Sequence, residues 1–292
     1  MTQGRGPAAG DALAGIGLMS AGVAFLSAND AIGKVLTAHY PAVQILFLRN
    51  LIALPVAMLI ALRIGGPAAL RTARPLAHLV RGALWLCAAA LFFTGLGRLG
   101  LAEATAILFA APIFITALSA LVLKERVGRW RWGAVGLGFI GVLVVVRPGG
   151  AAFQPAALFP LGTAFFYAAL MISARWVDPR ESVWTMMLYL VGAGALVSGL
   201  ASLAVWTPLH AADAWLFAGI ALFGTLGITL MTQAFRVAPA AVVAPFDYTA
   251  LIWATALGWA IWRDVPDAAT WAGAAIIMAS GAVVLMRGER AE

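Results

Sequence analysis

The sequence predicts an all-α integral membrane protein with ten transmembrane helices, arranged as two inverted five-helix repeats around a central cavity. Three observations predict this fold: an apolar composition, ten apolar segments of membrane-spanning length, and an internal repeat. Of the 292 residues, 63% are hydrophobic and 11% are charged, whereas a soluble domain carries about 25% charged residues. So little polar surface cannot cover a water-soluble globule, and the apolar excess is therefore expected to face lipid.

The charged residues favour a membrane over a nucleic acid as the partner. The formal net charge is +7, but the basic residues form no long run and alternate with apolar stretches of helix length. We therefore expect the lipid bilayer as a partner and no nucleic acid. The single cysteine, Cys87, and three scattered histidines provide no cluster of metal ligands, so neither a metal site nor a cofactor is expected.

Ten apolar segments are long enough to cross a bilayer, for which a helix needs about 20 residues. Charges, prolines and glycines mark their boundaries, and the connections between them are short. The first segment is too long for the core of a signal peptide and is expected to be retained. The segments are 12–36, 42–63, 76–97, 101–123, 132–147, 156–176, 182–206, 213–235, 239–262 and 268–286.

The basic residues predict the orientation in the membrane. With the N-terminus in the cytoplasm, fourteen of the 19 Lys and Arg residues lie at cytoplasmic ends of segments. Four lie at external ends: Lys34, Arg98, Arg147 and Arg263. This asymmetry follows the positive-inside rule. Both termini are therefore predicted to be cytoplasmic.

The two halves of the chain resemble each other. Residues 92–123 match residues 230–261 at a constant spacing of 138, and the match continues after a two-residue shift. Coincidence among apolar helices is the alternative, but polar landmarks and glycines recur in the same order. The matched positions are Thr94 with Thr232, Arg98 with Arg236, Gly133 with Gly273, and Gly141 with Gly281.

This repeat predicts the organisation of the chain and its function. We expect a cytoplasmic tail (1–10), a first repeat (11–148), an inverted second repeat (155–287) and a second cytoplasmic tail (288–292). Five helices are an odd number, so the second copy has to enter the membrane upside down. Inverted repeats allow one site to open alternately to either side of a membrane. The sequence therefore predicts an alternating-access transporter of a small molecule.

Two stretches carry a resemblance to a known family. The first comprises Ala104–Pro112 (ATAILFAAP), Lys124-Glu125-Arg126 and Gly133 to Gly141; the second comprises Ala238–Pro245 (APAAVVAP), Asp264 and Gly273 to Gly281. The pattern resembles that of the drug/metabolite transporter superfamily, in its EamA-like ten-helix branch. The second copy departs from it, because Asp264 stands where the family has Glu and no central proline corresponds to Pro112.

Within that superfamily, the chain most resembles bacterial inner-membrane exporters of aromatic and neutral amino acids. The resemblance implies a multi-pass protein of the bacterial inner membrane that exports such small-molecule substrates, and a monomer is expected. Multidrug or lipophilic-cation efflux, or another metabolite permease, is the alternative function. A membrane-embedded enzyme is not expected, since only His210 and Asp213 approach a catalytic spacing and no second acid joins them.

Ionisable residues within the segments are the first candidates for a substrate site, because charges in a membrane are costly and usually functional. Asp30 is expected to pair with Lys34, four residues later, or with Arg49. Arg49, the one deep cation in this interpretation, is alternatively a partner for a substrate carboxylate. Asp247 follows the helix-interrupting Pro245. It is expected to attract a substrate ammonium group or carry a proton, or otherwise to bind neighbouring hydroxyl groups.

Polar and aromatic side chains complete the predicted cavity. Thr229 and Gln233 lie on one polar face of the eighth segment, and Thr94 lies on a similar face of the third. Helix packing is the alternative explanation for both faces. An aromatic wall is expected as well, with ordinary packing as its alternative. Its members are Trp85, Tyr167, Tyr189, Phe246, Tyr248 and Trp253. A small zwitterion with an apolar side chain fits this balance of groups best.

Overall fold

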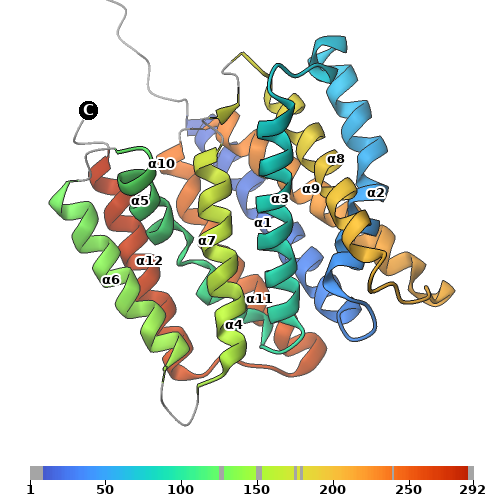
Figure 1. Cartoon of the computed structure of the whole chain (residues 1–292). Helices are drawn as coiled ribbons and strands as arrows, with labels where there is room; N and C mark the ends of the chain where they lie inside the picture. The colour runs from blue at the N-terminus through green and yellow to red at the C-terminus, as the bar shows by residue number, and fades with distance from the viewer. Residues whose placement is uncertain are drawn as a thin grey trace, which may run out of the picture.

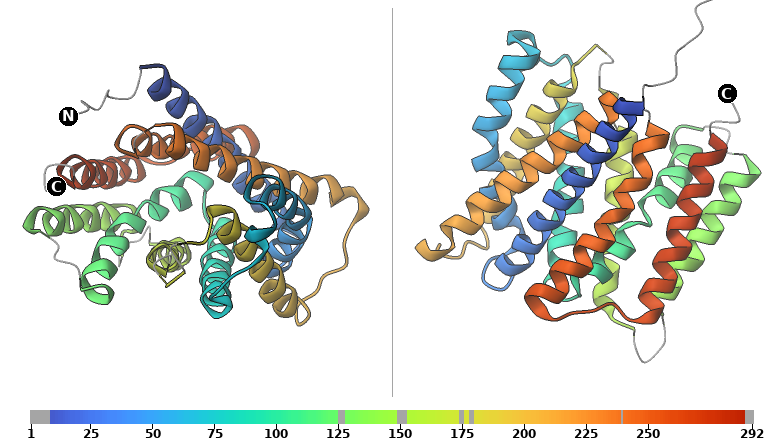
Figure 2. Two further views of the ribbon diagram at one scale, coloured as in Figure 1. Left: turned by 90° about the horizontal axis from the view of Figure 1, so that it is seen from above. Right: turned by 180° about the vertical axis from the view of Figure 1, so that it is seen from behind.

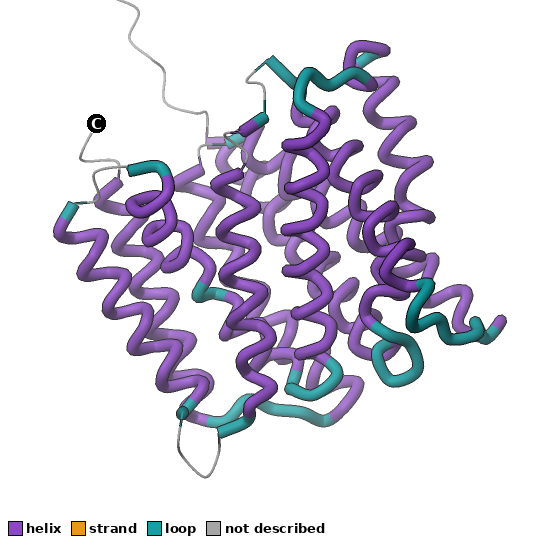
Figure 3. The backbone as a smooth tube through the Cα atoms, in the orientation of Figure 1, coloured by secondary structure: helices purple, strands orange, loops and turns teal. Residues whose placement is uncertain are grey.

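The structure, a computed structural model, describes residues 9–124, 128–148, 153–173, 176–177, 180–238 and 240–288. Within these residues every regular element is a helix, and no strand occurs (Figure 3). The predicted all-α fold is confirmed. Most of the two predicted tails lies outside the described residues, as do the motif residues Glu125, Arg126 and Pro239.

The helices fall into two sets along the chain (Figure 1). The first half contains α1 (Ala9–Leu36), α2 (Ala42–Ile60), α3 (Pro75–Leu96), α4 (Leu101–Leu108), α5 (Ala111–Val122) and α6 (Arg129–Val146). The second half contains α7 (Leu158–Ser173), α8 (Val183–Ser202), α9 (Ala214–Val237), α10 (Ala240–Val243), α11 (Ala250–Trp262) and α12 (Ala268–Gly288).

Seven helical stretches among the described residues are long and apolar enough to cross a membrane. Two further apolar helices, Trp132–Val146 and Ala268–Gly281, are shorter. The protein is therefore a multi-pass membrane protein, whereas the count of ten spans stays a prediction. The seven stretches are Asp11–Leu36, Ala42–Gly65, Pro75–Leu96, Leu101–Val122, Pro155–Ser173, Trp184–Ser202 and Ala211–Phe235.

Helix α1 begins and α12 ends at the same face of the bundle, which we name the terminal face (Figure 2). We name the opposite face the distal face. It holds the connections that follow α1, α3, α6, α8 and α11. Under the predicted orientation, the terminal face is cytoplasmic and the distal face is external.

Two predicted segments are broken in the middle. The segment from Leu101 to Val122 is interrupted at Phe109 and Ala110, where α4 ends and α5 begins with Pro112 near its start. The segment before Trp262 changes to a tight 3-10 helix over Ala244–Thr249, which has Pro245 in its first turn. Proline lacks an N–H donor and clashes with the preceding turn, so each break has a local cause in the sequence.

The main packing pairs each join one helix of the first half to one of the second. They are α1 with α9, α6 with α12, α2 with α8, α3 with α7, α3 with α8, α5 with α7, and α4 with α11. The largest hydrophobic core lies where several of these pairs meet, and it includes Phe93, Leu101, Ile220 and Leu251. The two halves are therefore interleaved, and each buries its apolar surface against the other.

Paired glycines bring two of these helix pairs into backbone contact. A Cβ on Gly141 of α6 would lie 2.9 Å from the carbonyl oxygen of Gly273 in α12, and one on Gly273 would lie 2.7 Å from the carbonyl oxygen of Gly141. Gly22 of α1 and Gly227 of α9 face each other in the same way, at 2.9 Å in both directions. Small residues permit such close approach of helices in membranes.

Gly141→Ala is expected to destabilise the protein by about 1–3 kcal/mol, because the new methyl group meets backbone atoms that cannot rotate away. Thermal unfolding in detergent micelles measures this as a lower Tm. Gly136→Ala, in the same helix, is the matched control, since no atom lies within 4 Å of its added Cβ. Equal Tm values for the two variants would contradict the proposed backbone contact.

Candidate functional site

Two cavities lie among the helices, and they differ in charge. The basic cavity, of about 460 Å³, is formed by α2, α3, α7, α8 and α9 and includes Arg49, Arg81 and Trp85. The acidic cavity, of about 420 Å³, is formed mainly by α1, α4, α5, α7 and the 3-10 helix and includes Asp30 and Asp247. Both volumes are in the range of sites for small molecules.

The basic cavity contains two guanidinium groups, and among the described residues Arg49 has no hydrogen-bond partner for any of its side-chain donors. The Arg49 guanidinium carbon lies 5.5 Å from the centroid of the Trp85 ring. Among the described residues, no carboxylate oxygen lies within 4.0 Å of Arg49. Arg81, by contrast, donates from one nitrogen to the Leu170 carbonyl (3.0 Å) and to the Ser173 hydroxyl (3.2 Å). Arg81 is thus a second deep cation, which the sequence interpretation missed.

Three threonines of α9 line the basic cavity without offering hydroxyl donors. Thr225, Thr229 and Thr232 each donate to the backbone carbonyl four residues earlier, at 2.7 Å. Their oxygens therefore face the cavity as acceptors only. Met171, Met186, Met187 and Trp184 supply apolar wall. A ligand in this cavity finds its donors mainly at Arg49.

The acidic cavity contains carboxylates from two separate elements. Asp30 of α1 accepts a hydrogen bond from the Asn29 side chain at 2.9 Å. Asp247 lies in the 3-10 helix that follows α10. Aromatic groups surround them, namely Tyr167 and Tyr248, and the Tyr248 ring meets Phe109 edge-on at 5.1 Å between centroids. Asp247 is exposed and Asp30 is half-buried, so both carboxylates are open to a cationic ligand or a proton.

The predicted pairing of Asp30 with Lys34 does not occur. The Lys34 ammonium donates to the Leu99 carbonyl at 2.7 Å and pairs with Asp264 at 3.4 Å, which draws it to the distal face. There, Lys34, Arg98, Arg147 and Arg263 line one open basin of about 870 Å³. These are the four basic residues for which the sequence predicts external positions.

Arg147 pairs with Asp267 in the same basin. The Arg147 guanidinium, and then the N–H and hydroxyl of Thr270, lower the pKa of Asp267 to about 2. Asp267 therefore stays ionised at neutral pH and begins α12 by accepting hydrogen bonds from its first turn. The ion pairs of Lys34 and Arg147 join α1, α6 and the connection between α11 and α12 at the distal face.

Seven of the twelve predicted site residues line a cavity. Arg49, Trp85 and Thr229 line the basic cavity, and Asp30, Tyr167, Asp247 and Tyr248 line the acidic cavity. The other five line neither: Thr94, Tyr189, Gln233, Phe246 and Trp253. The Thr94 hydroxyl donates to the Ala90 carbonyl, Phe246 packs with Met19 and Val23, and the Trp253 side chain is exposed.

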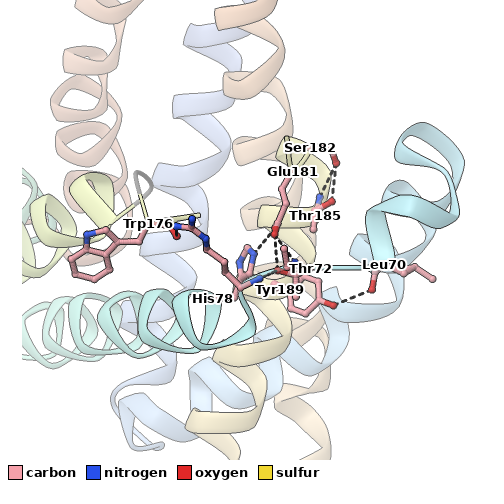
Figure 4. Close-up of polar contacts among 10 residues, drawn as sticks. Leu70, Thr72, His78, Trp176, Glu181, Ser182, Thr185 and Tyr189 are labelled. Carbon is pink, nitrogen blue, oxygen red and sulfur yellow. Dashed lines mark hydrogen bonds and ion pairs between the residues drawn. The ribbon is translucent and has the colours of Figure 1, made fainter. Parts of the chain in front are cut away.

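Tyr189 belongs to a polar cluster at the terminal face, around Glu181 (Figure 4). Glu181 Oε1 accepts from the Thr72 hydroxyl at 2.7 Å and from the Ala73 N–H at 3.0 Å. His78 Nε2 lies 2.7 Å from Glu181 Oε2, and both side chains are nearly buried. We name Thr72, Ala73, His78 and Glu181 the terminal clasp, because they tie the connection before α3 to the connection before α8.

Tyr189 supports this clasp from α8. Its ring stacks on His78 with 4.8 Å between centroids, and its hydroxyl donates to the Leu70 carbonyl at 3.0 Å (Figure 4). These contacts hold the Tyr189 side chain at the terminal face and not in the basic cavity. The residue is one helical turn or less from cavity residues Met186 and Leu190, so helical periodicity alone did not separate the two roles.

Sequence reasoning also missed two buried amides beside the charged residues. Asn29 and Asn50 are 2% and 3% exposed, and one polar atom of each side chain has no hydrogen-bond partner. Asn50 lines the basic cavity. The signal for both was present, because an amide inside an apolar segment also carries a desolvation cost, although a smaller one than the charges of Asp30 and Arg49.

The comparison with protein families matches this architecture twice. The model of the EamA-like transporter family matches residues 13–147 and again residues 154–286. The chain belongs to the EamA-like transporter family. The resemblance found in the sequence is confirmed. This EamA-like protein is a membrane transporter, and the name of its family indicates transport rather than catalysis.

Relatives of this EamA-like protein carry names that differ in substrate. It is 30% identical to the riboflavin transporter of Vibrio cholerae over 271 residues, 91% of each chain. It is 29% identical to the S-adenosylmethionine uptake transporter of Rickettsia bellii over 269 residues, 90% of each chain. It is 28% identical to the pseudopaline exporter CntI of Pseudomonas aeruginosa over 257 residues, 86% of this chain and 89% of the exporter.

A crystal structure matches the fold with a TM-score of 0.63 and 20% sequence identity, covering 94% of this chain and 99% of the other. At this identity the match shows the fold alone. The family and the names of its relatives support metabolite transport. The choice of substrate has to come from the side chains that line the cavities.

Glu181→Gln is expected to weaken the terminal clasp in a pH-dependent way. Burial alone would raise the pKa of Glu181, but hydrogen bonds from Thr72, His78 and Ala73 outweigh it and lower the pKa below its usual 4.5. The carboxylate therefore stabilises the fold above that value, and this contribution is lost as the pH falls through the lower folded-state pKa. The expected cost of the substitution at pH 7 is about 1–3 kcal/mol.

Thermal unfolding of wild type and Glu181→Gln across about pH 7 to pH 3 measures this effect. The difference in Tm between the two proteins should shrink below about pH 5. Tyr189→Phe, which removes one neutral hydrogen bond from the same cluster, should lower Tm by an amount that does not change with pH. A pH-independent difference for Glu181→Gln would contradict a stabilising carboxylate.

Proposed function

We propose that this EamA-like protein transports small zwitterionic metabolites, with neutral and aromatic amino acids as the first candidate substrates and export as the direction. One observation carries the proposal: the described interior holds two guanidinium groups without a carboxylate partner in one cavity, Arg49 and Arg81, and two carboxylates in another. A substrate with both an acid group and an amino group satisfies both sets of charges.

Each end of such a substrate has a chemically suitable partner. A carboxylate binds guanidinium through paired, charge-assisted hydrogen bonds, which suits Arg49. An ammonium group suits Asp30 or Asp247. Trp85 in the basic cavity and the two tyrosines of the acidic cavity offer aromatic faces to an apolar side chain or a cation. The size of either cavity is sufficient for an amino acid side chain.

The packing supports alternating access as the mechanism. Exchanging the two halves of the chain converts the pair α1 with α9 into the pair α3 with α7, and the pair α3 with α8 into the pair α2 with α9, while α2 with α8 and α6 with α12 keep their partners. This is the symmetry expected of two inverted copies. Rocking such copies against each other would open the cavities first to one face and then to the other.

We also propose in which membrane the protein lies and how it is oriented there. We place the protein in the bacterial inner membrane as a monomer, with the terminal face in the cytoplasm, because the excess of basic residues is predicted there. Names of relatives include both an uptake transporter and an exporter. Export is therefore proposed from the resemblance to amino acid exporters and not from the fold.

Efflux of lipophilic cations is the second candidate function. It is favoured by the acidic cavity, where Asp30 and Asp247 lie near Tyr167 and Tyr248 and no basic residue lines the wall. Such a substrate would leave Arg49 without a role in binding. The two candidates therefore make opposite predictions for Arg49 substitutions.

Counterflow in proteoliposomes tests the proposal, with labelled phenylalanine, tryptophan and leucine against tetraphenylphosphonium. Saturable exchange of the amino acids is expected, and Arg49→Gln and Asp247→Asn should each weaken it about tenfold, equivalent to about 1.4 kcal/mol per lost contact. Trp253→Phe is the matched control, because its exposed side chain lines neither cavity. Exchange of the cation alone, unchanged in Arg49→Gln, would replace amino acid transport with cation efflux.

A further inference from the structure

The Arg49 guanidinium is enclosed between a ring and a backbone. Trp85 of α3 stacks against it, with 5.5 Å between the guanidinium carbon and the ring centroid. Gly224 of α9 supplies the other contact: a Cβ at this glycine would lie 2.7 Å from a terminal nitrogen of Arg49 and 3.0 Å from its Nε. A side chain at position 224 and the guanidinium in its present place therefore exclude each other.

Asn29 faces the same point from α1. Its Oδ1 would lie 2.7 Å from the added Cβ of Gly224, so it is a near neighbour of Arg49 across the glycine. The amide nitrogen of Asn29 donates to Asp30, which directs the carbonyl oxygen away from that carboxylate. Asn29 Oδ1 is buried and accepts no hydrogen bond among the described residues. Asn29 therefore presents a neutral acceptor beside the same glycine, and it adds no negative charge that would neutralise the guanidinium.

A second glycine supports the ring. A Cβ on Gly194 of α8 would lie 3.2 Å from the Trp85 ring and 2.9 Å from the Asn50 amide nitrogen. Glycines of two neighbouring helices thus make room for the stacked pair. Four helices, α1, α2, α8 and α9, contribute to its surroundings in addition to α3.

We propose that Gly224 and Asn29 are positioning residues that, together with Trp85, hold Arg49 as a receptor for one planar carboxylate of the substrate. This inference rests on the proposed function and adds the residues that determine specificity for the acid group. A guanidinium held in place loses less conformational freedom when it binds, and its planar edge matches a carboxylate through two parallel hydrogen bonds.

A competing explanation is that Arg49 merely balances the charge of Asp30. Asp30 does interact electrostatically with Arg49. No oxygen of Asp30 comes within the 4.0 Å of an ion pair, however, and the hydrogen bond from Asn29 occupies that carboxylate. Arg49 also lines the basic cavity while Asp30 lines the acidic one. The donors of Arg49 remain available to a ligand.

The first test is a double-substitution cycle read by phenylalanine counterflow. Gly224→Ala should raise the half-saturating concentration about tenfold or more, because the methyl group displaces the guanidinium. Gly219→Ala in the same helix is the matched control and should change it less than about twofold, since its added Cβ meets only the end of the Ile32 side chain at 3.2 Å.

The cycle is completed in an Arg49→Lys background. Lysine lacks the terminal guanidinium nitrogen that would lie 2.7 Å from the added Cβ, and it has no planar group to displace, so Gly224→Ala should then cost less than about twofold. Equal costs in the two backgrounds would show that position 224 acts through general packing and would overturn the positioning role. Transport by the double variant also shows that the Gly224→Ala chain folds.

The second test reads the position of Arg49 without transport. Phenylglyoxal adds to accessible guanidinium groups, and peptide mass spectrometry gives the rate at Arg49 relative to the exposed Arg63. Gly224→Ala and Asn29→Leu should each change this ratio at least threefold, whereas Gly219→Ala should not. An unchanged ratio in both variants would overturn the inference.

Phenylalanine protection separates this inference from the proposed function. Protection of Arg49 in wild type, lost in Gly224→Ala, supports both. A ratio that changes in Gly224→Ala but is insensitive to phenylalanine in wild type would retain the positioning of Arg49 and overturn the assignment of amino acids as substrates.

Discussion

An unpaired polar group within hydrocarbon costs several kcal/mol, and this cost organises the interior of the molecule. The threonines of α9 return their hydroxyl protons to the carbonyls of the preceding turn. One nitrogen of Arg81 donates to a carbonyl and a hydroxyl of α7. Among the charged side chains that line the two cavities, Arg49 and Asp247 stand out, because no hydrogen bond or ion pair to either side chain is present in the described part of the chain. Their cost is offset when a ligand brings the missing partners.

The same apolar medium removes the hydrophobic drive for helices to associate, so close packing has to replace it. The glycine pairs at the crossings of α1 with α9 and α6 with α12 allow backbone to meet backbone. Both crossings join helices from different halves of the chain. The most extensive contacts therefore join the two halves, and a rearrangement that moves one half changes contacts in every main packing pair.

Patterns along the sequence predicted the features that each segment determines by itself, such as the position of a helix or of a break in it. Apolar runs located the helices, Pro245 marked one of the two breaks, and Lys34, Arg98, Arg147 and Arg263 met at one face. The break before Pro112 was not predicted. Periodicity could not predict what each helical face meets. Thr94 and Thr229 occupy similar faces, yet only Thr229 reaches a cavity. The partner of Lys34 is Asp264, 230 residues away, and no local spacing indicates it. The clearance at Gly224 likewise exists only because α2 crosses α9 at that level.

The location of the charges also links binding to movement. Arg49 lies on α2, while Asp247 lies on the 3-10 helix between α10 and α11, so the two poles of the interior belong to elements that do not form a main packing pair. A shift of one half against the other changes the separation of these poles. A zwitterion of fixed length then fits one arrangement better than the other, and differential affinity of this kind is what allows a ligand to shift a conformational equilibrium. A ligand that contacts only one of the two charged groups has a smaller difference in affinity between the two arrangements. Under the proposed function, the separation of charge would therefore serve selection of the substrate and its translocation together.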